Sequence, residues 1–475
     1  MDKRPDFPNY TDVLTKCGEP FFFYGKRTFR ANASFFAELY CKRKPLKNLP
    51  GLGFIVYTGT GWSEFDDMAL RNDLEMLVDD IALDCDVHGR VRATEADLLE
   101  IVKILKRRTM DNALAKPDPN AIPAANVLLY WGEVARDFEE RQYTPDVFVM
   151  NHLAIRYDSS ARAPQFESVI EEIMPDPDDR RVVQEYLGAA LFPANRTRKF
   201  LLCYGEGGCG KSVLVLFLTK LLGSSRVFDL NIESVKHDYA LAGLKTQTLL
   251  TASEAASRAL CTDGAEWVKK AVGGDFFQTQ MKFRNEKSDH HGTFSLVIVS
   301  NNRLQFQYEG RGDEWRDRLI PIFFGHHIPD ERRELGLADR LMGAEGPGIF
   351  NWFLDGARRV RRNDWRIVLS AVQRDRIERL LALSDPMAVF VRDHIVRSAG
   401  EYFTSADAWK RYVRVHESAG LPMLEEKTFY KKLAKAMGEI HRTTGMNSLP
   451  GRQRGYRGFV LIKENLNLAE PRVYA

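Results

Sequence analysis

The chain has 475 residues, too many for a single hydrophobic core, and with 44% hydrophobic and 28% charged residues it has the composition of folded globular domains. No apolar run is long enough to cross a bilayer and no signal-peptide pattern opens the sequence, so we expect a cytoplasmic protein without a membrane partner. The six cysteines form no CxxC pair and give no indication of a disulfide framework or a zinc cluster.

The first ninety residues have the Gly, Asn and Asp punctuation of short strands and turns, for example in FFFYGKRTFR (21–30) and GLGFIVYTGTGWSEFDD (51–67). The segment TEADLLEIVKILKRR predicts an amphipathic helix that Thr94 and Asp97 cap. The loop AKPDPNAIPAAN that follows is a candidate domain boundary. No chemistry is assigned to this part of the chain.

The middle of the chain changes from helical patterns to buried strands. PQFESVIEEIMPDPDDRRVVQEYLGAALFP (164–193) predicts a helical region. From there to about residue 350, apolar strands alternate with helices, in RKFLLCYG, GKSVLVLFLTKLLG, TQTLLTAS, GAEWVKKAVGG and FSLVIVSN. Short apolar strands without polar alternation are typical of a parallel sheet covered on both faces, so we expect an α/β core.

The C-terminal part is basic, since residues 401–475 contain 13 basic and 8 acidic residues. It is a candidate nucleic-acid surface, and a solvated basic face without a ligand is the alternative. GPGIFNWFLDGARRVRRNDW (346–365) predicts a helix that ends in a basic cluster. Two helices, SADAWKRYVRVHESAG and LEEKTFYKKLAKAMG, precede the hairpin-like RTTGMNSLPGRQRGYRGFVLI, which is the order of a winged helix.

These patterns divide the chain into five predicted parts. They are an N-terminal α+β domain (1–115), a helical collar (116–195), an α/β core (196–350), a basic helical linker (351–384) and a winged-helix domain (385–475).

The strongest motif is GEGGCGKS, which matches the P-loop pattern G-x-x-x-x-G-K-[ST] between a predicted strand and a predicted helix. In such a loop the backbone amides turn toward the β-phosphate, the lysine neutralises β- and γ-phosphate oxygens, and the hydroxyl binds magnesium. The predicted ligands are therefore ATP and Mg²⁺. The predicted nucleotide-binding residues are Gly205, Glu206, Gly207, Gly208, Cys209, Gly210, Lys211 and Ser212.

Polar residues follow two other predicted strands. Glu254, just after TQTLLTAS, is the candidate acid that holds the metal or orients the attacking water, and a surface glutamate that begins a helix is the alternative. FSLVIVSN ends at Asn301 and Asn302, either of which could reach the γ-phosphate, while a turn-forming asparagine is the rival interpretation. Arg316 and Arg318 precede another apolar strand, and one of them could act in a neighbouring subunit's site; a solvated or ion-paired arginine is the alternative.

The order of these parts resembles the superfamily 3 AAA+ helicases of the phage, plasmid and poxvirus primase-helicase type, over roughly residues 140–465. The resemblance rests on the P-loop, a strand that ends in Ser-Glu, KKAVGGD, a strand that ends in Asn, and D-R-L-I-P. It implies catalytic roles for Lys211, for Glu254 as the Walker B acid that shares magnesium with Ser212, for Asn301 as sensor, and for Arg318 as an arginine finger. No primase half is seen in the first hundred residues.

The resemblance also implies a β-hairpin in FFQTQMKFRNEKSDHHG that grips DNA in the central channel of a ring. The DNA-binding residues that it suggests there are Lys282, Arg284, Lys287 and His290. A metal site at His290 and His291 is the poorer interpretation, because adjacent residues on a strand face opposite ways. The sequence departs from the family at Gln280, where relatives have Arg, and at NNRL, where they have Asn-x-x-Pro, so the choice between Asn301 and Asn302 stays open.

The function that we expect is a homo-oligomeric, hexameric DNA helicase driven by ATP, for replication of a phage, plasmid or phage satellite. Its expected partners are single-stranded or forked DNA, an origin sequence, and a separate primase or other replication proteins. In the winged helix, EKTFYKKLAKA is the expected recognition helix, with Arg452, Arg454 and Arg457 on the wing. The alternatives are an origin-binding initiator ATPase, a DNA-packaging motor and a regulatory P-loop NTPase.

Overall fold

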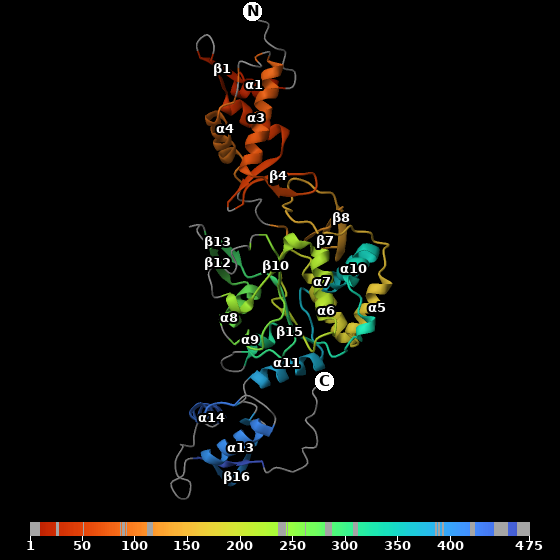
Figure 1. Cartoon of the computed structure of the whole chain (residues 1–475), viewed down its shortest axis with the longest axis vertical. Helices are drawn as coiled ribbons and strands as arrows, with labels where there is room; N and C mark the ends of the chain where they lie inside the picture. The colour runs from red at the N-terminus through yellow and green to blue at the C-terminus, as the bar shows by residue number, and fades with distance from the viewer. Residues whose placement is uncertain are drawn as a thin grey trace, which may run out of the picture.

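Three parts follow one another along the longest axis of the molecule in the computed structural model (Figure 1). The N-terminal part lies at one end, the α/β core in the middle, and the C-terminal part at the other end. Within the described residues, no helix combines the length and the apolar character that crossing a membrane requires. The structure describes residues 10–24, 28–50, 52–85, 87, 91, 93–111, 117–235, 244, 246–261, 263–280, 287–306, 312–384, 387, 390–391, 394–418, 423–440 and 455–462.

The N-terminal part contains more helix than its sequence indicated. The strands expected in 21–30 and 51–67 are present, but three helices were missed, α1, α2 and α3. The missed signal in α3 is the helical spacing of its buried residues Leu70, Leu74, Leu77 and Ile81. The elements are α1 (Thr11–Cys17), β1 (Phe21–Tyr24), β2 (Thr28–Ala31), α2 (Ala33–Arg43), β3 (Leu46–Leu49), β4 (Gly53–Tyr57), β5 (Trp62–Glu64), α3 (Asp67–Asp84) and α4 (Glu95–Arg108).

The start of α4 has the capping box that the sequence predicted. The Asp97 amide donates to Thr94 Oγ1 and the Thr94 amide donates to Asp97 Oδ2, both at 3.2 Å. Two of the amides that every helix start leaves without a partner are thereby satisfied.

The segment expected to be a helical collar begins with a small antiparallel sheet, so that expectation is corrected. Its three strands are β6 (Ala121–Pro123), β7 (Leu128–Gly132) and β8 (Asp137–Arg141), followed by helices α5 (Pro164–Ile173) and α6 (Pro177–Ala189). The strands were missed because β6 is short and lies in a Pro- and Asn-rich segment, which predicts a loop.

The core is a five-stranded sheet in which every pairing is parallel, as the apolar strands predicted. Its strand order is β10-β11-β14-β9-β15. The elements are β9 (Phe200–Tyr204), α7 (Lys211–Leu222), η1 (Ser224–Arg226), β10 (Val227–Asp229), η2 (Ile232–Ser234), β11 (Leu249–Ala252), α8 (Asp263–Gly273), β12 (Phe276–Gln280), β13 (Lys287–His291), β14 (Ser295–Ser300), α9 (Asp313–Arg316), β15 (Leu319–Phe323), η3 (Asp330–Arg332), α10 (Leu337–Arg362) and α11 (Ala371–Ser384).

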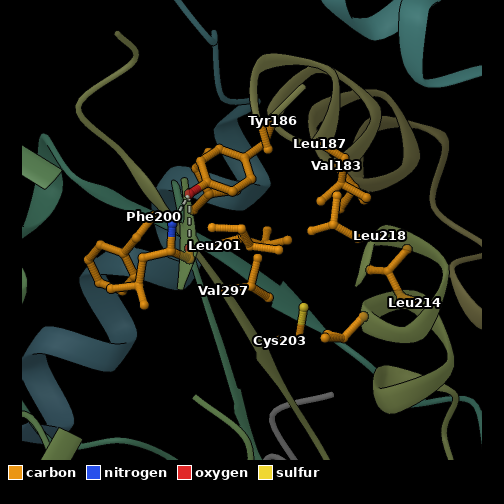
Figure 2. Packing of buried hydrophobic residues seen from close by; sticks show 14 of the residues in the cluster. Val183, Tyr186, Leu187, Phe200, Leu201, Cys203, Leu214, Leu218 and Val297 are labelled. Atoms are coloured by element: carbon orange, nitrogen blue, oxygen red, sulfur yellow. Dashed lines mark hydrogen bonds between the residues drawn. The ribbon is translucent and has the colours of Figure 1, made fainter. Parts of the chain in front are cut away.

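One face of this sheet packs against α6 and α7. Figure 2 shows Leu201 and Cys203 of β9 pointing toward Leu218 and Leu214 of α7, while Phe200 points away from them. This alternation is the two-residue period of a strand with both faces covered. The hydroxyl of Tyr186 in α6 reaches the sheet, where it accepts a hydrogen bond from the Leu296 amide and donates one to the Leu296 carbonyl, each at 2.9 Å (Figure 2).

The basic cluster at the end of α10 is paired with acids of the same chain. Arg358 Nε lies 2.8 Å from Asp137 Oδ1, and Arg362 Nη2 lies 3.2 Å from Asp137 Oδ2. Arg361 is buried, with Nη2 2.6 Å from Glu133 Oε1. These arginines fasten α10 to the small antiparallel sheet rather than forming a free basic surface.

The C-terminal part has its own core, in which Tyr412, Phe429 and Leu433 are buried. Two helices lie between two paired antiparallel strands, the order expected of a winged helix. The second strand pairs with the strand before the helices, whereas the sequence predicted a hairpin within 442–462; residues 441–454 lie outside the described residues. The elements are β16 (Ile395–Thr404), α13 (Ser405–Ser418), α14 (Glu426–Ile440) and β17 (Gly455–Leu461).

Replacing Tyr186 with Phe should lower the free energy of unfolding of the core by about 1–3 kcal/mol, because the amide and carbonyl of Leu296 lose a buried partner. Urea denaturation monitored by tryptophan fluorescence measures this change. Tyr157→Phe is the control, since Tyr157 is half-buried on the same cluster and its hydroxyl makes no hydrogen bond to a described residue. Equal stabilities for the two variants would contradict the role assigned to Tyr186.

Candidate nucleotide site and nucleic-acid surfaces

The three candidate nucleotide-binding segments lie at one edge of the parallel sheet. The P-loop follows β9, the Glu254 turn follows β11, and Asn301 follows β14. Because β14 pairs with both β9 and β11, the carboxyl ends of these three strands are neighbours. Side chains that are about fifty residues apart in sequence therefore meet at this edge.

The P-loop needs glycine at both fixed positions for reasons that the structure makes explicit. Gly205 has φ +146° and a Cβ on it would overlap the carbonyl oxygen of Phe324. Gly210 has φ +84°, caps the start of α7, and a Cβ on it would lie 2.9 Å from Ile173 Cβ. A side chain at either position would be strained in conformation as well as space.

Lys211 is buried at the first position of α7, and its ammonium group lies along the P-loop. Its Nζ donates to the carbonyls of Gly205 at 2.8 Å and Glu206 at 2.6 Å. Burial lowers the pKa of this lysine. Because its acceptors are carbonyl dipoles rather than carboxylates, an anion in the loop would compensate the buried charge better. Ser212, next along α7, is exposed.

Glu254 has a left-handed backbone conformation, with φ +59°. Such a conformation costs roughly 1–3 kcal/mol for a residue other than glycine and occurs preferentially at functional sites. The turn is fixed by the next residue, Ala255, whose amide donates to the Val299 carbonyl at 2.9 Å. The Glu254 side chain is exposed at the edge of the sheet, next to the loop that follows β14.

Ser300 joins the Glu254 turn to the Asn301 turn and was not found by sequence reasoning. It is fully buried, its hydroxyl donates to the Ala255 carbonyl at 2.7 Å, and its Oγ accepts from the Asn302 amide at 3.1 Å. Asn301 and Asn302 are both exposed. A serine at the end of an apolar strand was the available signal.

The two candidate finger arginines have different environments. Arg316 makes a two-point contact with Glu378 of α11, with Nε 2.6 Å from Oε1 and Nη2 2.8 Å from Oε2, and these bonds raise its pKa. Arg318 Nη1 donates to the Glu314 carbonyl at 2.9 Å, and its buried Nε has no hydrogen-bond partner among the described residues. The Arg316 guanidinium is thus paired with Glu378 of its own chain, whereas Arg318 Nε has no hydrogen-bond partner among the described residues.

Arg318 lies at the opposite edge of the sheet from the P-loop. It precedes β15, whose first residue, Leu319, is aligned with Phe200 at the start of β9. The P-loop begins after the other end of β9, so the length of a five-residue strand, about 16 Å, separates the two. The guanidinium lies beside Gly273 of α8, 3.5 Å from the position of a Cβ on that glycine.

The predicted β-hairpin is present as β12 and β13, which pair antiparallel from Phe276↔His291 to Gln280↔Lys287. Its base is fixed against α8, because a Cβ on Gly292 would overlap the Lys270 carbonyl. Lys282 and Arg284 lie outside the described residues. Lys287 and His290 are on β13, and their side chains are likewise outside the description, so all four DNA contacts stay predictions.

The second predicted DNA surface is a row of lysines on α14. Lys427, Lys431 and Lys435 are exposed at a four-residue spacing, on the side away from buried Phe429 and Leu433. On the neighbouring strand β17, Arg457 is exposed. The other two wing residues, Arg452 and Arg454, lie outside the described residues.

A resident metal site is not evident in the described part of the chain, since no group of three His, Cys, Asp or Glu side chains there could hold an ion. Magnesium that binds with a nucleotide needs fewer protein ligands, because phosphate oxygens and water complete its octahedron. The Ser212 hydroxyl and the Glu254 carboxylate are oxygen donors of the type that magnesium prefers, and both are exposed.

The parallel sheet, its covering helices and the P-loop define a P-loop α/β protein. Two apo structures of the C-terminal region of NrS-1 have a similar fold, each with a TM-score of 0.50 and 11% identity. One alignment covers 88% of this chain and 97% of the NrS-1 chain, the other 89% and 98%. At this identity the likeness concerns fold alone. No protein-family model and no curated protein matches the chain.

Replacing Ser300 with Ala should lower the free energy of unfolding by about 1–3 kcal/mol, because the Ala255 carbonyl and the Asn302 amide lose their buried partner. Hydrogen exchange should also become faster at the Asn302 amide. Ser253→Ala is the matched control, because Ser253 lies in the same turn and is exposed. If exchange at Asn302 were the same in both variants, the two turns would not depend on Ser300.

Proposed function

We propose that the protein is a ring-forming, ATP-dependent DNA helicase that serves the replication of a phage, plasmid or phage satellite. ATP and Mg²⁺ bind at the P-loop, where Lys211 neutralises phosphate charge and Ser212 and Glu254 hold the metal. Asn301 contacts the γ-phosphate and the attacking water. Arg318 of a neighbouring subunit completes the site, so hydrolysis takes place only between subunits.

The observation that carries this proposal is the separation of Arg318 from the P-loop. Within one chain they lie at opposite edges of the sheet, about one strand length apart. Among the described residues no carboxylate forms an ion pair with Arg318, so its positive charge is left for an anionic group such as a phosphate. Arg316 does not fit this role, since Glu378 already occupies its guanidinium.

The proposed movement of DNA depends on the position of the β12–β13 hairpin. The hairpin base contacts α8, and Arg318 lies beside Gly273 at the end of the same helix. A change at the subunit interface that moved Arg318 would therefore act on the base of the hairpin. Phosphate contacts by the hairpin lysines would be insensitive to sequence and weakened by salt.

The shared site is tested by mixing two inactive variants. Arg318→Ala and Glu254→Gln should each abolish ATP hydrolysis alone, but an equal mixture should recover part of it. In random closed rings about a quarter of the interfaces combine an intact Glu254 with an intact Arg318. The control is a mixture of Lys211→Ala and Glu254→Gln subunits, which should not recover hydrolysis, because every subunit then lacks a working P-loop side. Absence of recovery in the first mixture would argue that each chain hydrolyses ATP by itself.

Strand displacement on forked DNA separates the helicase from its alternatives. The helicase should unwind the fork with ATP, and single-stranded DNA should stimulate its hydrolysis. The exposed lysine row on α14 favours an origin-binding initiator as the second candidate, which would bind duplex DNA and hydrolyse ATP with little unwinding. Hydrolysis that is indifferent to any DNA would instead identify a regulatory NTPase.

A further inference from the structure

The segment between β15 and α10 passes directly over the P-loop. The Ile328 amide donates to the Gly208 carbonyl at 3.1 Å. The Phe324 carbonyl oxygen lies so close to Gly205 that a Cβ on this glycine would overlap it. This segment comes more than a hundred residues after the P-loop in sequence. It places a cation, Arg333, against the loop.

The Arg333 guanidinium is oriented by its own segment. Its Nε donates to the Ile328 carbonyl at 2.9 Å, and its Nη1 pairs with Asp330. The remaining nitrogen, Nη2, lies 3.1 Å from His327 Nε2 and packs against Gly208, so closely that a Cβ on Gly208 would overlap it. The nitrogen that touches the P-loop is therefore the one that Asp330 and Ile328 leave available.

The P-loop thus has two cations from its own chain at different positions. Lys211 Nζ lies on the carbonyls of Gly205 and Glu206 and is buried, while Arg333 lies at Gly208 with its side chain 41% exposed. The acids nearest to Arg333 in the described segment are Asp330, which pairs with it, and Glu331, which is exposed. Arginine presents a planar set of donors that suits phosphate oxygens.

We infer that Arg333 is a second phosphate-binding residue of the nucleotide site, supplied in cis and distinct from the finger supplied by a neighbouring subunit. The inference rests on the proposed binding of ATP at the P-loop. Its ligand is the polyphosphate of a nucleoside di- or triphosphate. Arg333 acts on affinity, because it is positioned before any neighbouring subunit completes the site.

The adjacent arginine provides a matched control. Arg332 is in the same short segment, but its Nη2 lies 2.8 Å from Glu172 Oε1 of α5 and its side chain is 62% exposed. Arg332→Ala removes the same charge from the chain without removing a group from the P-loop. A difference in nucleotide affinity between Arg332→Ala and Arg333→Ala therefore reflects the position of the lost arginine, because both variants lose the same net charge.

The test is direct binding of fluorescent ATP and ADP analogues to the full-length protein over a range of salt concentrations. Arg333→Ala should weaken both nucleotides by about tenfold or more, as expected for a lost charge-assisted hydrogen bond, and should reduce the salt dependence of binding. Arg333→Lys should restore part of the affinity, and Arg332→Ala should resemble the wild type. In hydrolysis assays KM should rise while kcat falls by less than about threefold.

Three results would overturn the inference: unchanged affinity in Arg333→Ala, an equal loss in Arg332→Ala, or a loss that Lys does not relieve and salt does not affect. The last result would mean that Arg333 only holds the segment over the loop. Failure of the proposed function is a separate outcome, since the wild-type protein would then bind neither analogue and Lys211→Ala would change nothing.

Discussion

Parallel pairing of β14 with both β9 and β11 is the constraint on which the candidate site depends. It brings the P-loop, Glu254 and Asn301 to one edge, since the carboxyl ends of parallel strands lie together. The pairing is supported from the helical layer, because the Tyr186 hydroxyl satisfies both backbone groups of Leu296. Ser300 then fixes the two turns beyond the strands to one another.

The same sheet also keeps Arg318 away from the residues proposed to bind phosphate and metal. Its carboxyl edge gathers the residues proposed to bind phosphate and metal, and its amino edge has Arg318. In the proposed mechanism a single chain therefore has an incomplete hydrolytic site, and the activity requires a second subunit. The similarity to the NrS-1 C-terminal region supports the fold and does not bear on this point.

Basic residues have contrasting uses along the chain. At the end of α10, Arg358, Arg361 and Arg362 are neutralised by acids of the small antiparallel sheet and contribute to packing. On α14, Lys427 and Lys431 face solvent opposite the buried side of their helix. Net charge alone did not distinguish these two groups, because pairing depends on which acids the fold brings within reach.

Local patterns in the sequence determined the elements with strong periodicity or exact motifs: the P-loop glycines, the α4 capping box and the apolar strands of the sheet. Each of these depends on residues close together in the chain. The sequence missed α1, α2, α3 and the strands of 121–141, where turn residues and apolar spacing gave conflicting signals. Tertiary structure alone decided that Ser300 links two turns, that Glu378 occupies Arg316, and that Arg333 lies on Gly208, because each contact joins segments far apart in sequence and depends on how the layers pack.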